Sequence, residues 1–94
     1  MKLEVGMYVR TINGKIWIIT SQKAISGHRK DIIKASYNII DLIEVGDYVN
    51  NERVEEIWKE IVLVGQECRP ISFNNIKSIV TKEQFESMKY SLEG

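Results

Sequence analysis

The sequence predicts a mainly β fold made of short strands, with one short helix near its C-terminal end. Two observations lead to this prediction. Short apolar segments recur at intervals of about 8–12 residues and are separated by turn residues, a pattern typical of small barrels. Only the segment from Thr81 has the signature of a helix start, because Gln84 follows three residues later as in a capping box.

A seven-residue segment occurs twice and relates the two halves of the chain. Residues 3–9, Leu-Glu-Val-Gly-Met-Tyr-Val, recur as residues 43–49, Ile-Glu-Val-Gly-Asp-Tyr-Val, with five identical positions. Each copy is followed by turn residues and an apolar strand with a tryptophan. We therefore expect one compact domain over residues 1–94, in which two SH3-like half-units span approximately residues 1–37 and 41–94, as one barrel or as two. Gly6 and Gly46 should then adopt the same backbone conformation, with Tyr8 and Tyr48 in corresponding strands.

The first half should contain three strands. A hairpin is expected at the Asn-Gly pair 13–14, since both central residues of a type I′ turn need positive φ. The return strand over residues 16–20 is apolar on both faces, which indicates cover on both sides or a contact with another chain. Residues 22–31 contain a Ser-Gly pair and several charges, and they predict a loop. A third strand over 32–37 and a helical turn over 38–42 complete this half.

The second half should continue the sheet with strands at short intervals. These are expected over residues 48–49, 54–57, 61–64, 71–73 and 76–80. Thr81 then begins a helix of about two turns, with Phe85 and Met88 on one face. The segment 90–92, Tyr-Ser-Leu, could close the sheet as a last strand.

Two segments of the second half carry a resemblance to known proteins. Residues 45–50 (Val-Gly-Asp-Tyr-Val-Asn) and 76–86 (Ile-Lys-Ser-Ile-Val-Thr-Lys-Glu-Gln-Phe-Glu) look like a loose group of small uncharacterised proteins encoded by phages and prophages of low-GC Gram-positive bacteria. The resemblance covers the C-terminal half, and it reaches the N-terminal half only through the repeat. It implies a viral origin and action inside a bacterial host. Small accessory phage proteins often bind and disable host machinery, including CRISPR nucleases and nucleotide-signalling defences.

The residues needed for catalysis are scarce. His28 is the only histidine and Cys68 the only cysteine, which is too few for a nucleophilic triad or for a zinc site built by one chain. Glu55 and Glu56 would point to opposite faces of a strand, so they form a poor acid–base pair. We expect no enzymatic activity, no cofactor and no metal. The lone cysteine and the absence of a long apolar segment predict a cytoplasmic protein without a membrane partner.

Two groups of residues are candidates for binding. The first is a basic cluster in the predicted loop and the strand after it, formed by Lys23, His28, Arg29, Lys30 and Lys34. It could bind a nucleotide phosphate, a nucleic-acid backbone or an acidic protein surface. The second is Trp58, which is flanked by charged residues and should be exposed, whereas Trp17 lies in an apolar strand and should be buried. The 13 basic and 13 acidic residues cancel, which argues against phosphate-driven duplex binding and leaves self-association open.

These features predict a non-enzymatic protein that inhibits a host defence protein, with a CRISPR effector as the most concrete partner. Two alternatives remain open: a sponge that sequesters a phosphate-bearing nucleotide signal, and an accessory protein that binds nucleic acid through the basic cluster. Homo-oligomerisation is compatible with each of them.

Overall fold

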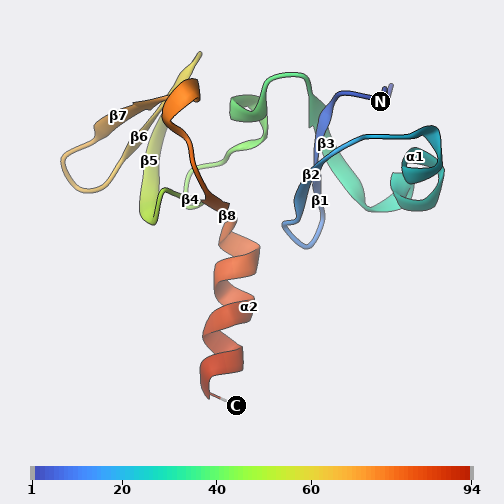
Figure 1. Cartoon of the computed structure of the whole chain (residues 1–94). Helices are drawn as coiled ribbons and strands as arrows, with labels where there is room; N and C mark the ends of the chain where they lie inside the picture. The colour runs from blue at the N-terminus through green and yellow to red at the C-terminus, as the bar shows by residue number, and fades with distance from the viewer. Residues whose placement is uncertain (1, 94) are drawn as a thin grey trace. The chain divides into compact units, whose positions relative to one another are not determined.

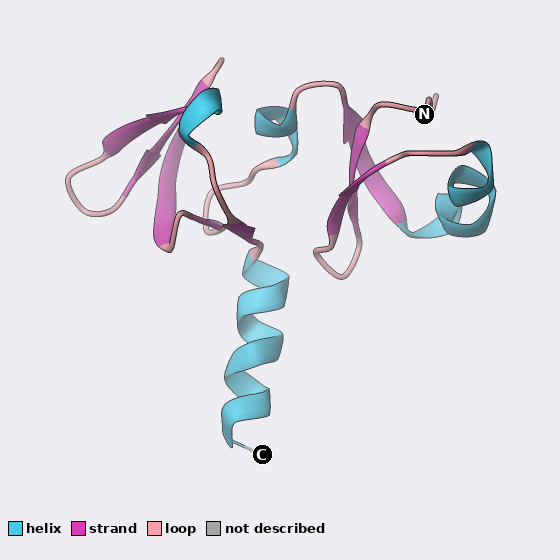
Figure 2. Ribbon diagram, viewed as in Figure 1, coloured by secondary structure: helices cyan, strands magenta, loops and turns pink. Residues whose placement is uncertain are grey.

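The computed structural model describes residues 2–93, and side chains up to residue 87. Its internal contacts divide the chain into two compact units, unit 1 (Met1–Leu42) and unit 2 (Ile43–Gly94). Each unit contains an antiparallel sheet, and the predicted mainly β fold is confirmed (Figures 1 and 2).

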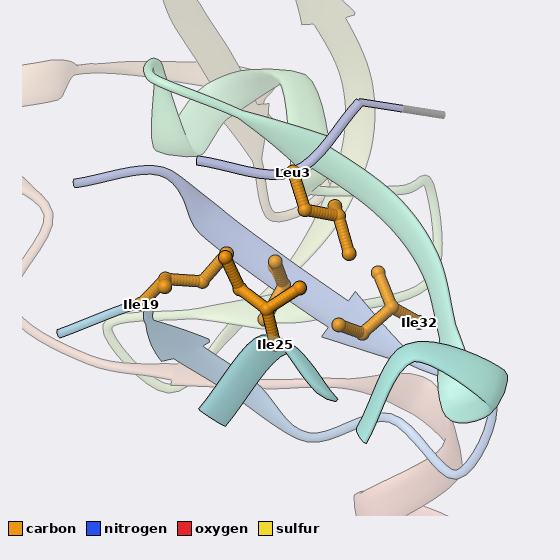
Figure 3. Packing of buried hydrophobic residues seen from close by; sticks show 5 residues of the cluster. Leu3, Ile19, Ile25 and Ile32 are labelled. Carbon is orange, nitrogen blue, oxygen red and sulfur yellow. The ribbon is translucent and has the colours of Figure 1, made fainter. Parts of the chain in front are cut away.

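Unit 1 is a three-stranded sheet with one short helix. Its elements are β1 (Tyr8–Thr11), β2 (Ile16–Ile18), α1 (Gln22–His28), the 3-10 helix η1 (Arg29–Asp31), β3 (Ile32–Ser36) and the 3-10 helix η2 (Ile39–Leu42). The sheet has the order β2-β1-β3, with β1 in the centre. The core joins Val9 of β1 to Leu3, Ile19, Ile25 and Ile32, all buried (Figure 3). One helix residue, Ile25, therefore holds α1 against the sheet.

Unit 2 consists of a five-stranded sheet followed in the chain by a helix. Its elements are β4 (Tyr48–Val49), β5 (Glu52–Trp58), β6 (Ile61–Val64), β7 (Arg69–Ser72), the 3-10 helix η3 (Phe73–Asn75), β8 (Ile79–Val80) and α2 (Lys82–Glu93). The order β7-β6-β5-β4-β8 describes a meander whose last strand returns to pair with the first. β5 pairs with β4 through its first two residues and with β6 from Val54 to Trp58, with a bulge between Val54 and Glu56. This connectivity is the one expected of an SH3-like unit.

The repeated segment forms the same turn in both units. Met7 N donates to Glu4 O at 3.2 Å, and Asp47 N donates to Glu44 O at 3.0 Å. The third residue of each turn is a glycine with φ of +98° in Gly6 and +100° in Gly46, as a type II turn requires. The expected equivalence of the two glycines is therefore confirmed.

The strands after these turns also correspond. Tyr8 is the first residue of β1 and Tyr48 the first of β4, and each strand lies between its successor and a later strand. The tryptophans, however, do not correspond. Val9 pairs with Trp17, but the equivalent Val49 pairs with Glu52. Trp58 lies beyond the bulge, in a part of β5 that has no counterpart in β2.

The loop predicted over residues 22–31 is wrong, since this segment forms α1 and η1. Ser21 caps α1, with its Oγ accepting from Ala24 N at 3.4 Å. Burial of Ile25 in the core adds tertiary stabilisation that a seven-residue helix would lack on its own. The charges of the segment lie on the solvent side of this helix, and they obscured a short amphipathic pattern.

Two further predictions need correction at turns and ends. The hairpin at residues 13–14 forms, but only Gly14 has positive φ. Its loop has three residues, because Ile12 also belongs to it, and a bond from Thr11 N to Lys15 O at 2.9 Å closes it. The two-residue turn with positive φ at both positions is Asn50-Asn51 instead. Residues 90–92 do not form a strand, because α2 continues to Glu93.

The capping box that begins α2 is confirmed. Gln84 N donates to Thr81 Oγ1 at 3.3 Å, and Thr81 N donates to Gln84 Oε1 at 3.1 Å. The helix is longer than the two turns predicted, since it spans 12 residues. Neither of the described α-helices has the length and apolar character needed to cross a membrane.

Candidate functional site

The basic cluster lies in unit 1 and is helical over most of its length. Lys23 and His28 belong to α1, Arg29 and Lys30 to η1, and Lys34 to β3. The first four side chains are exposed, and among the described residues no hydrogen bond or ion pair engages the cations of Lys23, Arg29 or Lys30. Lys34 differs from them, because it is half-buried and stands opposite Arg10 in the sheet. Four of the five residues are thus available to a ligand.

The hairpin between β1 and β2 adds to this basic surface. Ile12 N donates to Asp31 O at 2.8 Å, which ties the hairpin loop to η1. Ile12 is 68% exposed, the highest value among the exposed large hydrophobic residues, and Lys15 beside it is exposed as well. We call Ile12, Lys15, Arg29 and Lys30 the basic end of unit 1. It combines an exposed aliphatic side chain with three cations and one exposed carboxylate, that of Asp31.

His28 contacts an aromatic ring. The rings of Trp17 and His28 meet edge to face, with centroids 5.5 Å apart. Trp17 is half-buried against the core rather than enclosed, so its predicted burial is only partly met. Ile18 in the same strand is 44% exposed, so β2 is not covered on both faces. The histidine therefore shields a tryptophan at the end of α1.

The two units carry opposite charge. Residues 1–42 contain seven lysines and arginines against three carboxylates, whereas residues 43–94 contain six against ten. The formal net charge of zero over the whole chain conceals this asymmetry. Unit 1 is basic and unit 2 is acidic.

Trp58 is exposed, as predicted, and it lies on an apolar face of unit 2. It is 58% exposed and stands opposite Ile61 of β6, and Leu63 stands opposite Pro70 of β7. Residues opposite one another in antiparallel strands share a face, and alternate residues return to it. These four side chains form what we call the Trp58 face. The intervening residues Val62, Val64 and Ile71 are buried on the other side.

Carboxylates border the Trp58 face. Glu56 shares a row with Leu63 and Pro70, Glu60 lies in the β5–β6 turn and Glu67 in the β6–β7 turn. All three are exposed, and no ion pair with another described residue engages them. Nearby carboxylates differ in this respect, because Glu52 pairs with Arg69 and Glu55 with Arg53. The surface thus has apolar side chains with three carboxylates around them, and one exposed cation, Lys59, lies in the β5–β6 turn beside Glu60.

Two polar residues, Asn50 and Asp47, stabilise unit 2 and were not identified from the sequence. The Oδ1 of Asn50 accepts from Lys77 N at 2.7 Å and from Ser78 N at 3.1 Å, and its Nδ2 donates to Asn75 O at 2.8 Å. Asp47 is fully buried, and its carboxylate accepts from Glu44 N at 2.8 Å. These bonds close the sheet at β8.

The same carboxylate positions the helix. Asp47 Oδ1 accepts from Lys82 N at 2.9 Å, and the Lys82 ammonium forms an ion pair with Glu44 at 2.7 Å. The hydrogen bond to Glu44 raises the pKa of Lys82, against the smaller lowering effect of burial. The ring of Phe85 stacks on Tyr48 with centroids 4.5 Å apart. The first turn of α2 is therefore fastened to β4 and its preceding turn.

Within residues 2–87, no group of three or more His, Cys, Asp or Glu side chains is placed to hold a metal ion. His28 belongs to unit 1, and the exposed Cys68 to a turn of unit 2 where its φ is +51°.

No protein-family model, curated protein sequence or solved structure matches this chain. The candidate surfaces therefore rest on geometry, burial and charge.

Proposed function

We propose that this protein is a non-enzymatic binding protein whose principal site is the Trp58 face. The observation that carries the proposal is an exposed tryptophan that shares an apolar surface with Ile61, Leu63 and Pro70 on paired strands. Exposed tryptophans in such settings are typical binding hot spots. Because β5, β6 and β7 form a continuous sheet, the surface is presented on a rigid scaffold.

The partner we propose is a bacterial defence protein, with a CRISPR effector as the specific candidate and the host cytoplasm as the site of action. The resemblance of residues 45–50 and 76–86 to phage-encoded proteins supports this choice. A protein that inhibits by occlusion needs an anchored binding face, and the exposed Trp58 with its apolar neighbours supports this choice.

Restoration of infection tests this proposal. The chain is expressed in bacteria whose CRISPR system restricts a phage, and plaques are counted. Wild type and a Val45→Ala control should restore plaques, whereas Trp58→Ala should restore at least about tenfold fewer at equal protein level. Val45 suits the control because it is an exposed apolar residue in a turn of the same unit. Failure of the wild type against several CRISPR types removes the defence partner, and full activity of Trp58→Ala removes the site.

A second function is favoured by the basic end of unit 1 and by its neighbours Lys23 and His28. Exposed cations beside an aromatic pair could hold the phosphate of a nucleotide or of a nucleic-acid strand. An Arg29→Ala/Lys30→Ala double variant should then lose ligand while Trp58→Ala retains it. Nucleic acid would dissociate steeply with rising salt, because several counterions are released together, and a single nucleotide would dissociate less steeply.

A further inference from the structure

The two charged surfaces of this chain are complementary to each other. The basic end of unit 1 places the exposed Ile12 beside Lys15, Arg29 and Lys30. The Trp58 face places exposed apolar side chains inside a border of carboxylates, of which Glu56, Glu60 and Glu67 have no ion-pair partner within the described residues. An apolar centre with a charged border on each surface, of opposite sign, is the arrangement of a specific interface.

We propose that copies of this protein associate head to tail, with the basic end of one copy docked on the Trp58 face of the next. The excess of four positive charges in unit 1 against four negative charges in unit 2 steers the encounter in this orientation. Two basic ends, or two acidic faces, would repel each other. The net charge of zero leaves no overall repulsion between copies.

The geometry of such a contact has a consequence for the assembly. The two surfaces are different, so the contact is heterologous, and each copy that uses one surface still offers the other. Association can then extend to further copies, in rings or chains. Because the attraction involves exposed charges, it should weaken as salt increases. The proposal shares the Trp58 face with the function proposed above but does not depend on the identity of any host partner.

Mixing two damaged variants tests the head-to-tail arrangement directly. Trp58→Ala damages only the acidic face, and Arg29→Glu/Lys30→Glu damages only the basic end. Each variant alone should be monomeric in sedimentation velocity at concentrations where the wild type associates, with at least about tenfold weaker association. When mixed, they should form a one-to-one dimer, since the intact basic end of the first variant docks on the intact acidic face of the second. This dimer cannot grow, because both remaining surfaces are damaged.

Two controls separate this contact from general effects of charge and apolarity. Lys2→Glu changes the charge of unit 1 in the same direction at an exposed position near the N-terminus, and Val45→Ala removes exposed apolar surface from a turn. Val45→Ala should associate like the wild type, and Lys2→Glu should lose far less association than Arg29→Glu/Lys30→Glu, because it only reduces the long-range attraction. A wild type that stays monomeric up to millimolar concentration overturns the proposal and leaves the Trp58-dependent plaque assay unaffected. If the wild type associates but the two mixed variants form no dimer, the proposal is also overturned, and a symmetric contact is favoured instead.

Discussion

Replacing Asn50 with glycine should destabilise unit 2 while leaving the β4–β5 turn intact. Asn50 has a φ of +51°, which glycine adopts readily, so the turn itself loses nothing. The loss is three side-chain hydrogen bonds to residues 75, 77 and 78, at 2.7 to 3.1 Å. At about 0.5–1.5 kcal/mol for each bond, with water replacing part of the loss at this exposed site, we expect about 1.5–2.5 kcal/mol.

Thermal unfolding followed by circular dichroism measures this loss. In a domain of this size the change corresponds to a decrease in Tm of roughly 6–20 °C. Asn51→Gly is the matched control, because Asn51 occupies the next position of the same turn with a φ of +70° and has an exposed side chain. It should change stability by less than about 0.5 kcal/mol. Equal losses in both variants would mean that the turn, and not the bonds to the segment before β8, accounts for the effect.

Three other substitutions test separate parts of the structure. Thr81→Ala should lower the free energy of unfolding by about 0.5–2 kcal/mol, since the N-cap bond of α2 is lost, and urea denaturation checks this. Gly46→Ala should cost about 1–2 kcal/mol because of its φ of +100°, whereas Gly27→Ala, in a helix with open space around it, should stabilise by up to about 1 kcal/mol in the same assay. The hydrogen bond from Tyr37 to Glu4 raises the pKa of the phenol above its usual value of 10.0, so its contribution to stability is fully present below that pH and is lost as pH rises through the raised pKa. Glu4→Ala should return the phenol to ordinary titration by ultraviolet absorbance, and an unchanged titration would contradict the bond.

Local backbone features, namely the glycine turns and the start of α2, were the parts of the fold best predicted from the sequence. The two glycines at 6 and 46 have positive φ, and their recurrence in the repeated segment predicted the shared conformation, whereas the isolated Gly27 is helical. The capping box at Thr81 is equally local, because its two partners lie three residues apart. Signals of this kind need no knowledge of distant contacts.

Elements that depend on tertiary contacts were not predictable in the same way. α1 forms because Ile25 enters the core beside Leu3 and Val9, which lie far from it in sequence. The structural role of Asn50 likewise depends on a segment 25 or more residues away. In single-sequence reasoning, both features look like ordinary surface chemistry.

The candidate site likewise has one feature that could be predicted locally and others that depend on tertiary contacts. The exposure of Trp58 could be predicted from its charged neighbours, but the face around it needs the register that places Ile61 and Leu63 beside it. The available signal was the run from Ile61 to Val64, which is apolar at four successive positions and therefore leaves apolar residues on the outer side as well. The charge asymmetry could have been counted from the expected half-units 1–37 and 41–94, although the net charge of zero conceals it.

Differences between the two copies of the repeat indicate how the units became specialised. The turn is the same, but Met7 in unit 1 packs against the core, whereas Asp47 in unit 2 is a buried carboxylate that holds both the turn and the start of α2. A methionine at residue 47 could not accept these two bonds, and an aspartate at residue 7 would place a charge against an apolar cluster. The two half-units are therefore not interchangeable, although their opening strands are equivalent. One repeat serves as the scaffold for a basic surface, and the other for the acidic Trp58 face.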